Sequence, residues 1–247
     1  EAFGKLYHEN SKAWVFTSAT LSVKDSLLHF NRQMGLWEPA SLILPSPFDY
    51  ETQGLLCVPD DLPVPNEPHF SEKLCKRLWP LLKASDGGVF FLCTSLRAVD
   101  WVGEFLRDQI DSQQLDWQLL VQGEFSRAEL LERYRASQKP VLVGAASFWE
   151  GVDIRGPQLR LVVIDKLPFA PPDDPVFQAR SEQLKREGGN PFNQLSIPDA
   201  AIALKQGAGR LIRDESDWGV LLIGDRRLVE KPYGKLLWRS LPPFKRT

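Results

Sequence analysis

One glutamine, two glycines and two arginines lie close together near the carboxyl end of the sequence, in the segment Gln-Gly-Ala-Gly-Arg-Leu-Ile-Arg. On a continuous helix, Gln206, Arg210 and Arg213 share one face, because residues three and four positions apart lie above one another. Gly207 and Gly209 each cost such a helix roughly 1 kcal/mol relative to alanine. Small residues there let another backbone or a ligand approach closely. The segment therefore predicts a polar helix face that can contact a ligand; a solvated basic face is the alternative.

A second candidate segment, Ser-Phe-Trp-Glu-Gly-Val-Asp, directly follows the apolar run Val141–Ala145. Ligands of open α/β sheets bind beyond the carboxyl ends of the strands, which is where this segment is expected to lie. A loop whose aromatic side chains merely anchor it to the core explains the same residues. The candidates for ligand contacts are Ser147, Trp149, Glu150, Gly151 and Asp153.

A third candidate is the pair Thr94 and Ser95, which stands at the end of another apolar run and ahead of a helical period. Hydroxyl groups and the amino end of a helix can together hold a phosphate. Ordinary helix capping explains the same pair. Both interpretations fit the sequence.

The elements that must position these residues alternate from about Gly54 onward. Six apolar runs bounded by turn residues predict strands, at Gly54–Val58, Val89–Thr94, Leu119–Gln122, Val141–Ala145, Leu161–Ile164 and Val220–Ile223. Helical spacing of apolar residues separates several of them, as in Leu74–Leu82 and Ala98–Ile110. Helix starts are expected at Ser126, at Asp174-Pro175 and at Ser196. This alternation predicts an α/β domain with a mainly parallel sheet flanked by helices.

The first fifty residues follow a less regular pattern. Ala13–Phe16 fits a strand and Val23–Met34 fits a helix, but prolines at 39, 45 and 47 then interrupt the pattern. We therefore expect a boundary near residue 50, with residues 1–50 and 51–247 belonging to different domains.

Composition limits the possible functions. The net charge of −2 argues against a nucleic-acid binder that works by bulk charge alone, although it permits a local phosphate-contacting groove. No apolar run approaches the ~20 residues of a membrane helix, so no membrane contact is expected. Cys57, Cys75 and Cys93 lack metal-ligand spacing such as C-x-x-C, which favours reduced, buried thiols of a cytoplasmic protein over a metal site.

Taken together, the segments resemble the helicase motifs of superfamily 2, specifically the XPD/DinG-like group. The matching segments are Thr17–Leu21 for motif III, Ser46-Pro-Phe48 for the segment that follows it, Phe91–Ser95 for motif IV, Ser147–Asp153 for motif V and Gln206–Arg213 for motif VI. Lys166–Phe169, followed by Pro172 and Pro175, is also similar to this group. The motifs occur in the correct order over nearly the whole chain, and among bacterial members they are most similar to the YoaA branch.

This resemblance implies that residues 51–247 form the second RecA-like motor domain of a helicase. Residues 1–50 then correspond to the tail of the first RecA-like domain and a linker. The sequence contains neither a G-x-x-x-x-G-K-[ST] phosphate loop nor an Asp-Glu-x-His box, which in the family hold ATP and Mg²⁺ on the first domain. The 4Fe–4S cluster of many relatives also belongs to that other half.

The roles of individual residues follow from the same resemblance. Arg210 and Arg213 are expected to reach the γ-phosphate of ATP between the two domains, with Gln206 sensing closure. The residues expected near the nucleotide are Glu150, Gly151, Asp153 and Gly209. Those expected to contact single-stranded DNA are Thr94, Ser95, Ser147 and Trp149. Phe148 is expected to anchor the loop in the core, which would leave Trp149 free to stack on a base.

A protein-interaction module without catalytic activity is the alternative function. The basic end Phe244–Thr247 follows two prolines and would be such a contact. The resemblance to the YoaA branch suggests the chi subunit of the clamp loader as its partner. A frayed, solvated tail explains the same residues.

Overall fold

The computed structural model describes residues 13–23, 26–149, 154 and 158–247. Within these residues, seven strands form one sheet: β1 Gly54–Cys57, β2 Val89–Leu92, β3 Gln118–Val121, β4 Pro140–Gly144, β5 Leu161–Ile164, β6 Gly219–Ile223 and β7 Lys245–Arg246. They pair in the order β3-β4-β2-β5-β6-β1-β7, and every pair is parallel. The predicted α/β fold and its six predicted strands are confirmed.

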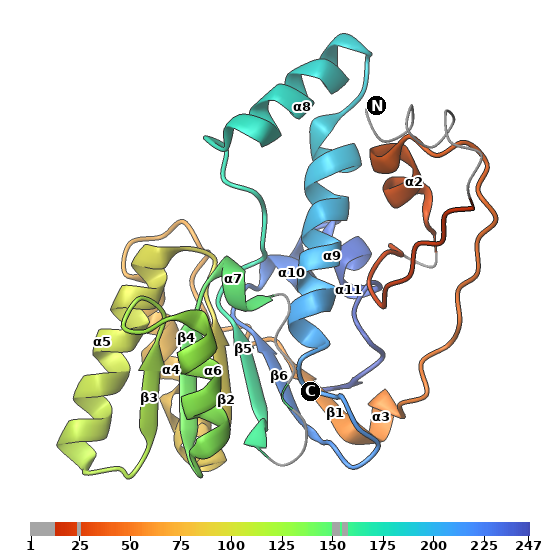
Figure 1. Ribbon diagram of the computed structural model, residues 1–247. Helices are drawn as coiled ribbons and strands as arrows, with labels where there is room; N and C mark the ends of the chain where they lie inside the picture. Colours follow the sequence, from red (N-terminus) through yellow and green to blue (C-terminus); the bar gives the residue numbers. More distant parts are fainter. Residues whose placement is uncertain (1–12, 24–25, 150–153, 155–157) are drawn as a thin grey trace.

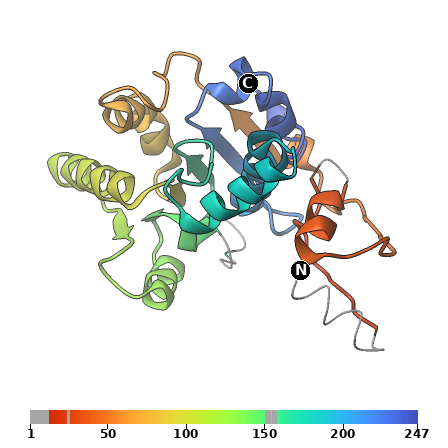
Figure 2. The same ribbon diagram turned by 90° about the horizontal axis from the view of Figure 1, so that it is seen from above.

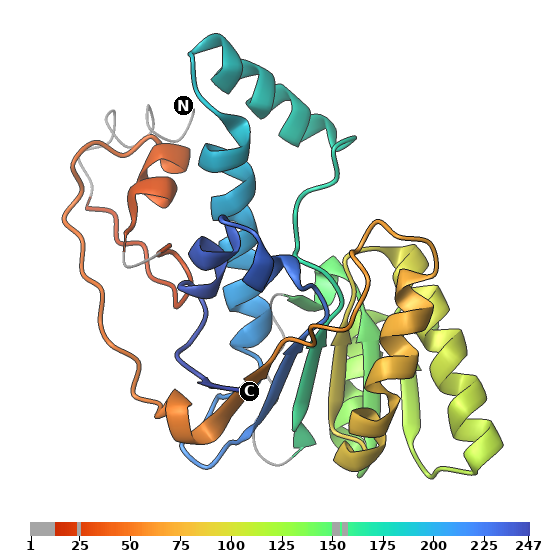
Figure 3. The same ribbon diagram turned by 180° about the vertical axis from the view of Figure 1, so that it is seen from behind.

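Helices cover both faces of the sheet (Figure 1). Their bounds are α2 Leu28–Met34, α3 Tyr50–Gln53, α4 Phe70–Ser85, α5 Leu96–Gln113, α6 Arg127–Ala136, α7 Ala146–Trp149, α8 Pro175–Arg186, α9 Ile197–Ala208, α10 Arg227–Glu230 and α11 Gly234–Trp238, with a π-helical turn, η2, at Phe192–Ser196. Helices α4 and α5 pack on one face, which Figure 3 shows toward the viewer, while α6, α7 and α9 pack on the other. Adjacent strand residues point to opposite faces, so Phe90 and Phe91 belong to different halves of the core.

All three predicted helix starts are confirmed, and two of them are capped by a side chain. The side chain of Ser126 accepts a hydrogen bond from the Glu129 N–H, and that of Asp174 accepts one from the Phe177 N–H, at 3.3 and 2.7 Å. Helix α9 begins at Ile197, directly after Ser196, with Asp199 in its first turn, although Ser196 has helical backbone angles and makes no capping hydrogen bond through its side chain. The π-helical turn η2 leads directly into α9, so the amino end of α9 is not capped by a free side chain there.

The carboxyl end of the chain is an ordered edge of the sheet. Lys245 and Arg246 pair with Leu55 and Leu56 of β1, which corrects the expectation of a frayed tail. Phe244 is buried, and its ring packs where a side chain on Gly54 would stand: a Cβ there would lie 1.9 Å from the ring. Glycine at this position therefore allows the last strand to dock.

The segment from Ala13 to Asp49 lies outside the core. None of its described residues is buried, and Figure 2 shows it at the end of the molecule opposite to α5. Ala13–Phe16 does not form the predicted strand, and the predicted helix over Val23–Met34 is formed only from Leu28, with residues 24–25 outside the described part. Helix α2 contacts α9 through the His29 imidazole and the Asp199 carboxylate, 2.8 Å apart.

Among the helices that the structure describes, none is long and apolar enough to cross a membrane.

Candidate functional site

The carboxyl ends of β2, β4 and β5 bring several candidate residues together. The Cys93 N–H donates to the Gly144 carbonyl at 2.8 Å, and the Asp165 N–H donates to the Leu92 carbonyl at 3.0 Å. Thr94 and Ser95 after β2 therefore lie between helix α7 after β4 and Asp165 after β5. The described start of motif V, Phe148 and Trp149 in α7, thus lies at the same edge as motif IV.

Ser95 caps helix α5. Its side-chain oxygen accepts a hydrogen bond from the Ala98 N–H at 3.2 Å, and its backbone is extended, as is usual for an N-cap residue. The residue is exposed, so its hydroxyl hydrogen can still point outward. The capping interpretation thus applies to Ser95, and it leaves room for a second contact.

Thr94 is held by a buried carboxylate. Asp165 is 2% exposed, and its Oδ1 accepts the Thr94 N–H at 3.0 Å and the Lys166 N–H at 2.6 Å. Its Oδ2 accepts the Thr94 hydroxyl at 3.3 Å. Burial raises the pKa of Asp165 to about 7, although these donors and the Lys166 charge act in the opposite direction. Asp165 is absent from the residues predicted from sequence, and an acid directly after a wholly apolar strand was the signal for it.

Trp149 is a core residue. Its side chain is 5% exposed, and its indole N–H donates to the Cys93 carbonyl at 3.2 Å. Phe148 is also buried, as predicted, but the expectation that Trp149 faces a groove is wrong. The reason lies far along the chain: a Cβ on Gly207 would stand 3.0 Å from the Trp149 ring, so the glycine provides the space that the ring fills.

The polar helix face expected for motif VI does not form. Helix α9 ends at Ala208, so Arg210 and Arg213 lie beyond it and only Gln206 is helical. Arg210 is 7% exposed, and its Nε and Nη2 donate to the Trp149 carbonyl at 3.1 and 2.6 Å. The arginine therefore joins the carboxyl end of α7 to the carboxyl end of α9. In this way the structure links motif V to motif VI by a buried hydrogen-bonded contact.

Arg213 lies in the loop before β6, close to the start of β1. Asp217 holds this loop, because one of its carboxylate oxygens accepts the Arg213 and Asp214 N–H groups, each at 2.8 Å. From helix α3, the Gln53 side-chain amide donates to the carbonyls of Asp214, Glu215 and Asp217 at 2.9, 3.0 and 2.9 Å. Neither Asp217 nor Gln53 was predicted from sequence. The hydrogen bonds from Gln53 to this loop join segments about 160 residues apart.

The candidate residues thus lie at two opposite edges of the sheet, one formed by the carboxyl ends of the strands and the other by their amino ends. Thr94 and Ser95 follow a strand, whereas the Arg213 loop precedes one, at the opposite edge of the same parallel sheet (Figure 1). Gln206 and Gly209 are half-buried at the end of α9, between the two. Glu150, Gly151, Asp153 and the side chain of Ser147 lie outside what the structure describes. No cluster of metal-binding side chains occurs among the described residues.

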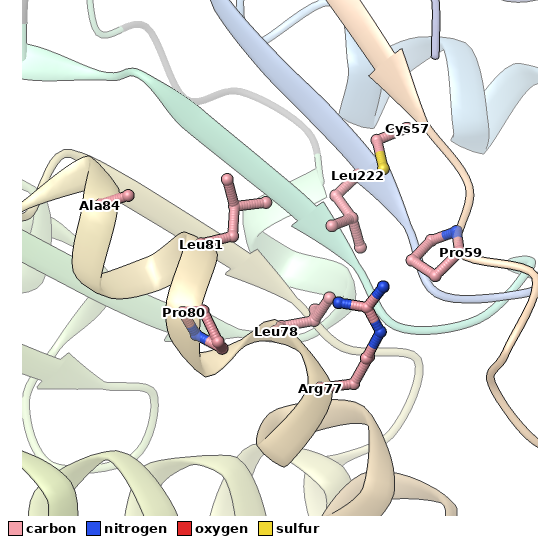
Figure 4. A pocket seen from close by; sticks show the side chains of 8 residues that line it. All are labelled: Cys57, Pro59, Arg77, Leu78, Pro80, Leu81, Ala84 and Leu222. Atoms are coloured by element: carbon pink, nitrogen blue, oxygen red, sulfur yellow. The ribbon is translucent and has the colours of Figure 1, made fainter.

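An apolar pocket of about 430 Å³ lies on the other face of the sheet, between α4 and strands β1 and β6. Figure 4 shows Leu78, Leu81 and Leu222 in its wall, together with the charged side chain of Arg77. Arg77 is paired with Asp61 at 2.6 Å. The described residues that line the pocket belong to neither of the two edges above, and they offer no carboxylate or hydroxyl group to orient a ligand.

Comparison with known proteins gives a consistent result. The helicase C-terminal domain family matches residues 78–244. Over all 247 residues the chain is 47% identical to the ATP-dependent DNA helicase YoaA of Escherichia coli (strain K12), of which it covers 38%. It is 39% identical to the ATP-dependent DNA helicase DinG of Photobacterium profundum, over 94% of this chain and 34% of that relative.

Among solved structures, the fold is similar to the one named XPD_APO, with a TM-score of 0.63 and 18% identity. The match covers 89% of this chain and 46% of that one, so the chain spans less than half of each of these three proteins. The chain therefore belongs to the helicase C-terminal domain family, and the resemblance to the XPD/DinG-like group that its motifs indicate is confirmed.

Proposed function

We propose that this chain is the second motor domain of an ATP-dependent 5′→3′ DNA helicase. It contributes arginine to an ATP molecule held mainly by the first RecA-like domain, and it contacts single-stranded DNA at the other edge of its sheet. The observation that carries this proposal is the hydrogen bond from buried Arg210 to the Trp149 carbonyl. It joins the two motifs through which nucleotide binding and DNA binding must communicate.

The proposed roles of the two arginines differ. Arg210 donates to the Trp149 carbonyl, so its proposed role is to hold the carboxyl end of α7 beside the end of α9. Arg213 stands in a loop whose backbone is fixed by Asp217 and Gln53, an arrangement that suits a side chain reaching toward a neighbouring domain. A preorganised guanidinium stabilises the charge that develops on a transferring phosphoryl group. Gln206 and Gly209 of the same motif stand at the end of α9.

The proposed domain division at residue 50 is supported by burial. Seven large apolar side chains are exposed in the first segment, at Trp14, Val15, Leu28, Trp37, Leu42, Ile43 and Leu44. Exposed apolar groups in this number are typical of a surface that another part of a protein covers. The remainder of the first RecA-like domain is the occupant that the motif order implies.

The proposed cofactors are ATP and Mg²⁺, bound mainly outside this chain. The residues present fit only a part of such a site, namely the arginines and the motif V segment. The cysteines of this chain do not fit a 4Fe–4S cluster. Two of the three are buried on the face of the sheet that α4 covers, and the described residues contain no metal-binding cluster.

The alternative function is a non-catalytic module that binds the clamp-loader chi subunit. Fewer residues of the basic end are exposed for such a contact than the sequence suggested. Phe244 is buried and cannot be offered to a partner. Lys245 and Arg246 are exposed on the edge strand β7, and the Arg246 guanidinium lies over the Trp238 ring at 4.6 Å.

Phosphate release by the purified 247-residue chain separates the two functions. We expect no ATP hydrolysis above background, with or without single-stranded DNA, because the sequence has no phosphate loop to position ATP. The full-length protein, assayed in parallel, is expected to release phosphate in a DNA-dependent manner. Hydrolysis by the isolated chain would overturn the proposed division, and inactivity of the full-length protein would favour the module.

A further inference from the structure

The hydroxyl hydrogen of Thr94 is already used within the protein. An ionised carboxylate only accepts hydrogen bonds, so Thr94 must be the donor in its 3.3 Å contact with Asp165 Oδ2. The non-bridging oxygens of a DNA phosphate also only accept hydrogen bonds. While Asp165 is ionised, the Thr94 hydroxyl therefore cannot donate to a phosphate.

The two oxygens of Asp165 have separate tasks. Both backbone donors, the Thr94 and Lys166 N–H groups, are bound by Oδ1, at 3.0 and 2.6 Å. Among the described residues, only the Thr94 hydroxyl is bound by Oδ2. A proton on Oδ2 would reverse this last hydrogen bond without disturbing the other two, and Thr94 would then be able to donate outward.

We propose that Asp165 is a positioning residue that sets the direction of the Thr94 hydroxyl, and so decides whether Thr94 can donate to a phosphate of single-stranded DNA. The inference rests on the proposed function, in which the end of β2 faces the DNA. Thr94 is half-buried beside exposed Ser95, so part of the residue reaches the surface at the end of β2.

The surroundings of Asp165 make the direction of the Thr94 hydroxyl dependent on pH. The groups that face it are the Cys75 thiol from α4, the Cys93 thiol at the end of β2 and the neighbouring Lys166 ammonium. Burial raises the pKa of both thiols, so they stay neutral near pH 7. At the end of β6, Asp225 is bound to Arg227 at 2.6 Å. Because the pKa of Asp165 is raised to about 7, its carboxyl gains a proton as the pH falls from about 8 to 6.

Asp165→Asn is the matched variant, because an asparagine oxygen can replace Oδ1 while its NH₂ group donates to Thr94. Single-strand affinity is measured in the full-length protein with a fluorescent oligonucleotide, without nucleotide, at pH 6 and pH 8. One charge-assisted hydrogen bond is worth about tenfold in affinity. Because the carboxyl is still partly protonated at pH 8 and not fully protonated at pH 6, we expect wild-type binding to strengthen roughly fivefold from pH 8 to pH 6. For Asp165→Asn we expect the tighter binding at both pH values.

Thr94→Val provides the control, since valine has nearly the same shape and no hydroxyl. If Asp165→Asn strengthened binding only by removing a negative charge, the gain would persist in the Asp165→Asn/Thr94→Val double variant. The proposal expects the gain to disappear there. A persistent gain, or equal affinities of wild type and Asp165→Asn at pH 8, overturns the role of Asp165 alone. A wild type that binds no single-stranded DNA at either pH overturns the proposed function as well.

Discussion

Replacing Arg213 with alanine in the full-length protein is expected to reduce ATP turnover by about 10³–10⁵-fold, the usual effect of removing an arginine that acts in the transition state. The backbone of its loop should stay in place, because Asp217 binds the N–H of residue 213, which alanine keeps. Single-strand affinity and melting temperature should therefore be nearly unchanged. Steady-state phosphate release, oligonucleotide binding and thermal unfolding measure the three quantities.

Arg239→Ala is a matched control for this experiment, because Arg239 is an exposed arginine at the end of α11 and belongs to none of the motifs. It should retain full turnover. Arg210→Ala is expected to behave differently from Arg213→Ala, since Arg210 is buried against the Trp149 carbonyl and its loss should lower both turnover and stability. Turnover of Arg213→Ala within a few-fold of the wild type would show that this residue does not reach the nucleotide.

Replacing Trp149 with alanine is expected to lower the free energy of unfolding by about 3–5 kcal/mol, as is usual for deletion of a large buried side chain. The ring fills the space left by Gly207 on α9, so its removal leaves a cavity between α7 and α9. Urea unfolding of the purified chain measures the change. The folded fraction of the variant is expected to bind single-stranded DNA as the wild type does.

Trp149→Phe separates packing from hydrogen bonding. It keeps most of the apolar volume but loses the indole N–H that binds the Cys93 carbonyl, so a smaller loss of roughly 1 kcal/mol is expected. If Trp149→Ala instead unfolds like the wild type and loses about 1–3 kcal/mol of single-strand affinity, the ring stacks on a base after all.

The strands could be predicted from sequence because each of the six is a short apolar run bounded by turn residues. Strand β7 could not, since it has only two residues, both charged, and depends on Phe244 packing over Gly54. The sequence also failed to predict that α9 ends at Ala208, before Arg210 and Arg213. Leu211 and Ile212 continue the helical spacing, but Arg210 instead donates to the Trp149 carbonyl, and Asp217 binds the N–H groups of the following turn.

The site was predicted where its parts follow strands and missed where its contacts span the chain. Thr94, Ser95 and the described start of the motif V segment, Phe148 and Trp149, follow strands as expected, because the carboxyl ends of parallel strands meet at one edge. The burial of Trp149 depends on Gly207, and the support of Arg213 depends on Gln53. Such pairs are brought together only by the fold, so their spacing in the sequence carries no signal.

Binding of ADP with aluminium fluoride, which imitates the transferring phosphoryl group, tests the central claim most directly. The measurement compares full-length wild type and Arg213→Ala in the presence of Mg²⁺ and single-stranded DNA. Transition-state analogues bind at least about 10²-fold more tightly than ground-state ligands where the protein is complementary to the transition state. We expect the wild type to gain such affinity on addition of aluminium fluoride, and Arg213→Ala to lose that gain while binding ADP alone equally well. An equal gain in both proteins would contradict the account, because the arginine of this chain would then make no contact with the transferring phosphoryl group.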